Sequence, residues 1–125
     1  MRIFEYNFFV KNQSLKEFKA GIFQALAHPT RVAIAEILRD GELSAGAILE
    51  QLGLEQANVS QHLAVMRAKG VVSNRKEGNQ VFYSLRHPML VDVLNIMRQY
   101  FLQQLSEASE MLQAIEVEEE HSPQV

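Results

Sequence analysis

Residues 56–85 read QANVSQHLAVMRAKGVVSNRKEGNQVFYSL, and the spacing of their apolar side chains changes once along the stretch. In the first half Val59, Leu63 and Met66 recur at steps of three and four residues, which is the period of a helix that buries one face. Gly70 follows, and glycine is a common helix terminator. The first half therefore predicts an amphipathic helix that ends at Gly70.

The second half has the spacing of β-strands. Two runs rich in β-branched and aromatic residues, 71–76 and 80–85, flank Glu77-Gly78-Asn79. A Gly-Asn pair between two such runs favours a tight hairpin turn. We therefore expect a β-hairpin to follow the helix directly.

Further helices are predicted upstream of this stretch. Residues 14–26 and 29–39 each carry an apolar stripe at helical spacing, and His28-Pro29 separates the two. Ser44 is a good N-cap for a short helix that Gly53 closes. Two short helices joined by a tight turn that contains glycine form a helix-turn-helix motif, so we expect one to precede the hairpin.

The first ten residues show a different spacing. Phe4, Tyr6, Phe8 and Val10 share one face at period two, with Ile3 and Phe9 on the other face. This spacing fits either a short strand or an extended arm, and the sequence does not separate the two.

The longest periodic segment begins after His87-Pro88. Its apolar residues from Leu90 to Ile115 alternate steps of four and three, close to the seam of a coiled coil. At ~1.5 Å per residue such a helix reaches about 40 Å, so we expect much of the seam to meet a second chain. The residues expected at that dimer interface are Leu90, Leu94, Met97, Phe101, Leu105 and Leu112. The acidic tail from Glu116 to Val125 is expected to fray.

Composition restricts the class of protein. The chain has 125 residues, of which 47% are hydrophobic, and this is the size of one globular domain. No apolar run reaches the roughly 18–20 residues of a membrane span. An acid at Glu5 and the lack of a continuous apolar core near the start argue against a signal peptide. The chain has no cysteine, which excludes disulfides and thiolate metal sites, and we expect a cytoplasmic protein.

The net charge of −3 is unevenly distributed along the chain. Residues 1–55 hold six Lys or Arg and seven acids, whereas residues 56–86 hold five basic residues against Glu77 alone. Residues 87–125 hold seven acids against Arg98. A basic middle segment in an acidic chain indicates a localised anionic partner, although a solvated charged surface fits the same distribution.

The helix predicted after Gln56 has an unusual outer face. Its side opposite the apolar stripe presents small residues around one amide, namely Ala57, Gln61, Ala64 and Ala68, flanked by Asn58, Ser60 and Arg67. Small side chains allow a helix to enter the major groove, where Gln or Asn reads adenine and an Ala methyl meets thymine. The alternative interpretation is an Ala-rich surface that reflects helix propensity alone.

The hairpin favours the DNA interpretation. Arg75 and Lys76 lie beside the Gly78-Asn79 tip, so a basic ribbon adjoins the helix and can reach the DNA backbone or a groove. We therefore expect a mainly α protein with a small β-hairpin, an α+β winged helix-turn-helix that dimerises through its N-terminal and long C-terminal helices. The expected segments are an N-terminal arm (1–13), a DNA-binding domain (14–86), a dimerisation helix (87–116) and an acidic tail (117–125).

Three stretches resemble the ArsR-type bacterial repressors: 25–34 (ALAHPTRVAI), 59–63 (VSQHL) and 70–85 (GVVSNRKEGNQVFYSL). The resemblance covers about residues 20–86, in the family's order. It implies a homodimeric winged-helix repressor that binds double-stranded operator DNA, an inverted repeat, and leaves it when an effector binds. By the resemblance the recognition helix contains Gln56, Asn58, Ser60, Gln61 and His62. The remaining expected DNA contacts are Arg67, Arg75, Lys76, Asn79 and Gln80.

The resemblance does not extend to the effector. Metal-sensing members of the family carry a Glu-Leu-Cys-Val-Cys type run, and the matching residues here are Glu42-Leu43-Ser44-Ala45-Gly46, which hold no sulfur. Other members place Asp and His ligands on the last helix, where Asp92 has no His near it. We therefore expect no metal site, no cofactor and a non-thiol effector of unknown identity. The chain also lacks a Cys nucleophile, a phosphate-binding Gly loop and a Ser elbow, which argues against an enzyme.

Two other functions fit part of the sequence. The long C-terminal helix and the aromatic N-terminal residues suit a protein–protein interaction module that binds no DNA. The aromatic residues Phe4, Tyr6, Phe8 and Phe9 also suit a small-ligand sensor with a pocket between the arm and the first and last helices. Alternatively, these residues only pack on the partner chain. Salt-dependent binding to a DNA duplex distinguishes a regulator from the interaction module, since phosphate contacts release counterions.

Overall fold

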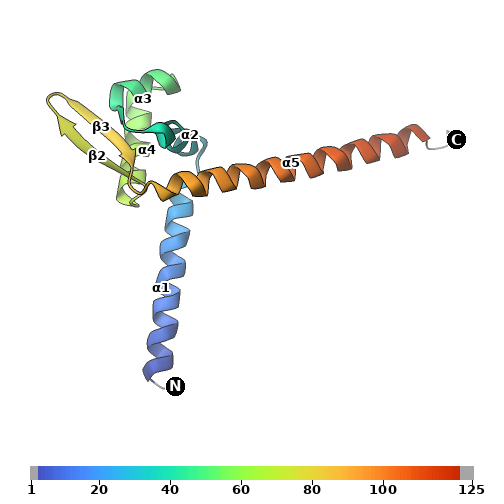
Figure 1. The fold of residues 1–125 in the computed structure, drawn as a ribbon, viewed down its shortest axis with the longest axis horizontal. Coiled ribbons are helices and arrows are strands. Elements are labelled where there is room, and N and C mark those ends of the chain that lie inside the picture. Colours follow the sequence, from blue (N-terminus) through green and yellow to red (C-terminus); the bar gives the residue numbers. More distant parts are fainter. Residues whose placement is uncertain (1–2, 122–125) are drawn as a thin grey trace. The chain divides into compact units, whose positions relative to one another are not determined.

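The computed structural model describes residues 3–121, with side chains from Gln13 onward, and its chain divides into two units at Pro88 (Figure 1). The first unit contains α1 (Ile3–Leu26), α2 (Pro29–Ile37), the 3-10 turn η1 (Leu38–Asp40), β1 (Leu43–Ser44), α3 (Ala45–Leu52), α4 (Gln56–Ala68), β2 (Val72–Glu77) and β3 (Gln80–Leu85). The second unit contains the single helix α5 (Met89–His121). The first unit is a winged helix-turn-helix, as the sequence predicts.

The helix-turn-helix motif begins and ends at the predicted residues. The Ser44 hydroxyl accepts a hydrogen bond from the Ala47 N–H at 3.1 Å and caps α3. Gly53 ends α3 with φ +65°, a left-handed conformation that glycine adopts without strain. Upstream, Pro29 occupies the first turn of α2, where its missing N–H costs no hydrogen bond. Local signals therefore set the start of α2 and both ends of α3, and the turn after Gly53 leads from α3 into α4.

The sheet has three antiparallel strands in the order β1-β3-β2. β2 and β3 pair from Val72 opposite Leu85 to Glu77 opposite Gln80, and Gly78-Asn79 forms the turn between them. Gly78 has φ +60°, which a tight hairpin turn requires. β1 has only two residues and pairs with Tyr83 and Phe82 in the middle of β3, so the hairpin beyond Phe82 is a two-stranded wing.

The hydrophobic core of the first unit joins its helices to the base of the wing. The fully buried side chains are Ile34, Leu38, Ile48, Val59, Met66, Val71 and Val72. The predicted inner face of α4 is confirmed, because Val59, Leu63 and Met66 are at most 3% exposed. Because the core buries this face of α4, the opposite face is the one exposed to solvent.

The prediction of a strand or an extended arm near the N-terminus is wrong for the backbone. α1 starts at Ile3, so the expected strand or extended arm is part of one helix. No Gly or Pro occurs between Ile3 and Ala20, and extending an existing helix is easier than starting a new element. The side chains of Phe4, Tyr6, Phe8 and Phe9 lie outside the described residues, and so does their proposed pocket or packing.

The second unit is longer than predicted. α5 has 33 residues and continues to His121, although we expected fraying from Glu116. Glutamate is a good helix former, which explains why the acidic segment extends the helix. None of the described residues of α5 is buried. Among residues 3–121, no helix combines the length and apolar character needed to cross a membrane.

Candidate nucleic-acid interface

The outer face of α4 is exposed. Gln61 lies between Ala57 and Ala64 on this face, and all three are exposed. The other predicted contacts of this helix that are exposed are Gln56, Asn58, Ser60 and Arg67. The face therefore offers amide and hydroxyl groups on a surface of small side chains.

The start of α4 differs from the start of α3. Glu55 occupies the N-cap position of α4 in an extended conformation, and its side chain makes no capping hydrogen bond. The first backbone N–H groups of α4 are therefore without a side-chain acceptor among the described residues. Such groups, together with the helix dipole, favour an anion near the helix start.

His62 is turned away from the rest of this face. Its ring is half-buried and lies against the His28 ring, with centroids 4.2 Å apart. Arg31 Nη1 lies 3.2 Å from His62 Nδ1, while other guanidinium nitrogens of Arg31 donate to the Ala25 and Gln24 carbonyls at 2.8 and 3.1 Å. Since arginine can only donate, His62 Nδ1 is the acceptor and Nε2 carries the proton.

This environment opposes a positive charge on His62. Burial lowers the pKa of His62 below its usual value, and the nearby His28 and Arg31 lower it further. His62 therefore connects α4 to α2 and the end of α1 as a neutral ring. Arg31, which makes the connection, is a residue that the sequence analysis missed.

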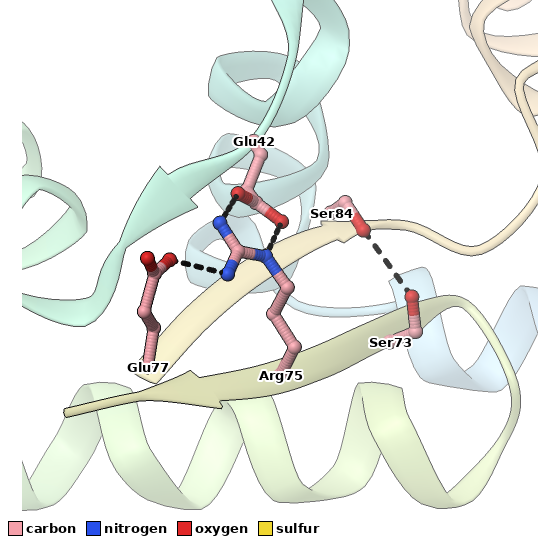
Figure 2. Close-up of polar contacts among 5 residues, drawn as sticks. All are labelled: Glu42, Ser73, Arg75, Glu77 and Ser84. Atoms are coloured by element: carbon pink, nitrogen blue, oxygen red, sulfur yellow. Dashed lines mark hydrogen bonds and ion pairs between the residues drawn. The ribbon is translucent and has the colours of Figure 1, made fainter. Parts of the chain in front are cut away.

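The wing carries an ion-pair network that the sequence analysis also missed (Figure 2). Arg75 Nε and Nη2 donate to Glu42 Oε2 and Oε1 at 2.9 and 2.6 Å, and Arg75 Nη1 donates to Glu77 Oε2 at 2.6 Å. The same guanidinium lies 4.6 Å from the centroid of the Phe82 ring. The hydrogen bond from Arg75 lowers the pKa of Glu42, and the two carboxylates raise the pKa of Arg75. Arg75 is thus occupied by two acids in the free chain.

The other predicted wing residues are exposed. They are Lys76, Asn79 and Gln80. Because successive strand residues alternate between faces, Lys76 lies on the opposite face of β2 from Arg75. Within the part of the chain that the structure describes, no acid forms an ion pair with Lys76. β2 also packs against α4, so the wing and the outer face of α4 belong to one unit.

The helices α1 and α5 each expose several large apolar side chains. On α1 these are Leu15, Phe18 and Phe23. Of the residues predicted at a dimer interface on α5, Leu90, Leu94 and Met97 are half-buried, while Phe101, Leu105 and Leu112 are exposed. Leu105 is 67% exposed, so its apolar side chain faces solvent in the single chain.

Sequence comparison relates the chain to bacterial regulators. Residues 28–74 match the bacterial regulatory proteins of the arsR family. The helix-turn-helix transcriptional regulator Rv0081 of Mycobacterium tuberculosis is 36% identical over 105 residues, which cover 83% of this chain and 92% of that protein. The transcriptional repressor SdpR of Bacillus subtilis is 33% identical over 76 residues, covering 61% of this chain and 84% of SdpR.

Comparison of structures gives the same fold. The crystal structure of M. tuberculosis Rv0081 matches with a TM-score of 0.70 at 38% identity, over 76% of this chain and 96% of that chain. The solution structure of the homodimeric winged helix-turn-helix DNA-binding domain of Mb0332 from Mycobacterium bovis matches with a TM-score of 0.72 at 23% identity, over 78% of this chain and 90% of that chain. The second match supports the winged-helix fold alone.

Proposed function

Because the chain belongs to the ArsR family of bacterial regulatory proteins, we propose that it is a homodimeric transcriptional repressor that binds operator DNA through α4 and the wing. The observation that carries this proposal is the exposed face of α4, where Gln61 projects from a surface of small residues beside the wing. The name of the similar SdpR as a repressor supports the direction of regulation. In this role the protein acts in the cytoplasm and needs no catalytic activity.

In the proposed interface, one set of residues contacts base edges and another set contacts the DNA backbone. Gln61, assisted by Gln56, Asn58 and Ser60, contacts base edges from α4, since amides match the donor and acceptor pair of adenine. The residues proposed to contact the DNA backbone are His62, Arg67, Lys76, Asn79 and Gln80. For His62 the available donor is Nε2–H, because Arg31 occupies Nδ1.

The proposed dimer uses the exposed apolar faces of α1 and α5. A second copy covers Leu105 and its neighbours on α5, while the side chains of α1 supply a second surface. Two copies related by a two-fold axis present two copies of α4, so the operator is expected to be an inverted repeat. In this assignment residues 14–86 bind DNA and residues 87–116 dimerise.

The proposed effector is not a thiol-bound metal. The chain has no cysteine, and among residues 13–121, whose side chains are described, no group of three His, Cys, Asp or Glu could hold a metal ion. Release from DNA therefore depends on a ligand of another class.

Selection of duplexes from a random pool tests the proposal. The purified chain should enrich an inverted repeat, and its affinity for that duplex should fall steeply between about 50 and 200 mM salt, since counterions are released. A chain that enriches no sequence and shows no salt-dependent binding is not a DNA-binding repressor.

A further inference from the structure

Glu42, Arg75 and Glu77 form an ion-pair network that we call the wing latch (Figure 2). It lies where the sheet changes from three strands to two. β1 pairs with β3 only as far as Phe82, and Arg75 is the β2 residue opposite Phe82. Glu42 directly precedes β1, which leads into α3. The wing latch therefore fastens the start of the two-stranded ribbon to the helix-turn-helix motif.

The charges of the wing latch do not suit a phosphate contact. One guanidinium is bonded to two carboxylates, so the summed charge of the three side chains is negative at neutral pH. Three of the five guanidinium N–H donors bond to these carboxylates, so a phosphate could use only the remaining two and would lie beside two negative charges that repel it. The pair with Glu42 uses two nitrogens and two oxygens, which is a strong geometry for an exposed ion pair. Arg75 is therefore better suited to hold the wing than to hold DNA.

Lys76 has the properties that Arg75 lacks. Both residues are exposed, but Lys76 lies on the other face of β2, and no acid forms an ion pair with it within the described residues. Its ammonium group can meet a phosphate without first leaving a carboxylate. In the wing, Arg75 is therefore suited to hold the structure together, and Lys76 is suited to contact a phosphate.

Building on the DNA binding proposed above, we propose that Arg75 is a positioning residue that stays bonded to Glu42 and Glu77 on DNA, sets the angle of the wing, and leaves the phosphate contact to Lys76. Glu42 then determines DNA affinity although it is an acid that touches no DNA. Removal of its negative charge weakens DNA binding, which is the opposite of the effect expected from long-range electrostatics.

Measurements of duplex affinity against salt, on the duplex selected above, test this proposal with four variants. We expect Glu42→Gln and Arg75→Gln each to weaken binding about threefold to tenfold, for operator and random duplexes alike, without a lower salt slope. The double variant should bind no more weakly than Arg75→Gln, because both changes break one network. Lys76→Gln should lower the salt slope by about one for each protomer.

Two further variants separate positioning from charge. Asp40→Asn removes the same charge from the same exposed segment, two residues before Glu42, and should bind DNA as tightly as the wild type or slightly more tightly. The exchange Glu42→Arg with Arg75→Glu restores a pair of opposite charges and should recover most of the affinity. Recovery by the exchanged pair requires that the two side chains act on each other.

The outcomes distinguish the wing latch from the function on which it rests. If Arg75→Gln lowers the salt slope by about one for each protomer while Glu42→Gln strengthens binding, Arg75 is a phosphate contact and the proposal is wrong. If the wild type binds no duplex, the proposed function fails, and amide hydrogen exchange of the free protein still tests the wing latch. Exchange at residues 75–82 should be faster in Glu42→Gln than in Asp40→Asn, and equal rates would overturn the wing latch.

Discussion

Gln61 has Ala57 and Ala64 as its neighbours on the outer face of α4, so nothing on this face prevents its amide from reaching a base. We expect Gln61→Ala to flatten the preference for one base pair in each half-site, by about 1–3 kcal/mol for a bidentate contact. The salt slope should not change, since no charge is lost. Competition binding with operators substituted at each position measures both quantities.

An amide elsewhere in the chain provides the control for this variant. Gln103 is an exposed glutamine on α5 that donates to Glu107, and Gln103→Ala should leave base preference unchanged. A result in which Lys76→Gln alters the base preference and Gln61→Ala only lowers affinity would mean that the wing reads the sequence and α4 does not.

His62 makes stability depend on pH. Burial, His28 and Arg31 lower its pKa below the usual 6.5, so the unfolded chain binds a proton at higher pH than the folded chain. The free energy of unfolding should therefore decrease as pH falls through 6.5 towards the lowered pKa of the folded state. We expect His62→Gln to remove part of this decrease, whereas His87→Gln, at an exposed position, should not.

Thermal unfolding of the wild type and both variants at about pH 7.5, 6.5 and 5.5 measures this dependence. A wild-type melting temperature that does not fall between the first and last of these values would show that His62 is not held neutral.

The sequence predicts individual residues well where the relevant neighbours are close along the chain. The buried face of α4 follows from the three- and four-residue spacing of Val59, Leu63 and Met66. The Arg31–His62 and Glu42–Arg75 contacts join residues 31 and 33 positions apart, so they depend on how the elements pack. Only Glu77, two residues from Arg75 on one strand, left a local signal that sequence analysis could have used.

Among the helices and strands, α5 is the element on which the proposed dimerisation can be tested. Leu105 is 67% exposed in the single chain, and we expect Leu105→Glu to place charges inside the proposed interface and to raise the dimer dissociation constant at least about tenfold. Analytical ultracentrifugation over a range of concentrations measures this constant. A matched control is Gln104→Glu, which adds a charge one residue away at an exposed polar position.

A wild-type chain that sediments as a monomer at micromolar concentration would contradict the proposed role of α5. An equal effect of Leu105→Glu and Gln104→Glu would show that charge, and not the apolar seam, determines association.

The boundaries of the elements follow from the sequence where a cap or a turn marks them. Ser44, Gly53 and Gly78 lie at predicted ends, and each acts through local backbone chemistry. The period-two spacing before Val10 did not indicate a strand, since the backbone there continues α1. β1 was missed because two residues carry no periodicity, and β3 defines it as a strand by pairing with it.

For the whole molecule, the set of residues predicts that transition metals do not change the affinity for DNA. The chain has no cysteine, and the side chains described from Gln13 to His121 form no cluster of three possible ligands. Addition of zinc, nickel or cobalt to the complex with DNA should therefore change the affinity by less than about twofold. Fluorescence anisotropy of a labelled operator measures this, and a tenfold loss on adding one equivalent of any of these metals would reveal a site that this set of residues does not predict.

The exposed seam of α5 also determines how the proposed repressor responds to its own abundance. None of the described side chains of α5 is buried within its own chain, so in the proposed repressor this helix is covered only when two copies associate. A monomer presents only one α4 to an operator that needs two. Below the dimer dissociation constant, operator occupancy rises with about the square of the chain concentration, and halving expression reduces it about fourfold. The fit of one α5 against its partner, together with the affinity of the dimer for its operator, therefore sets the expression level above which the regulated gene is switched off.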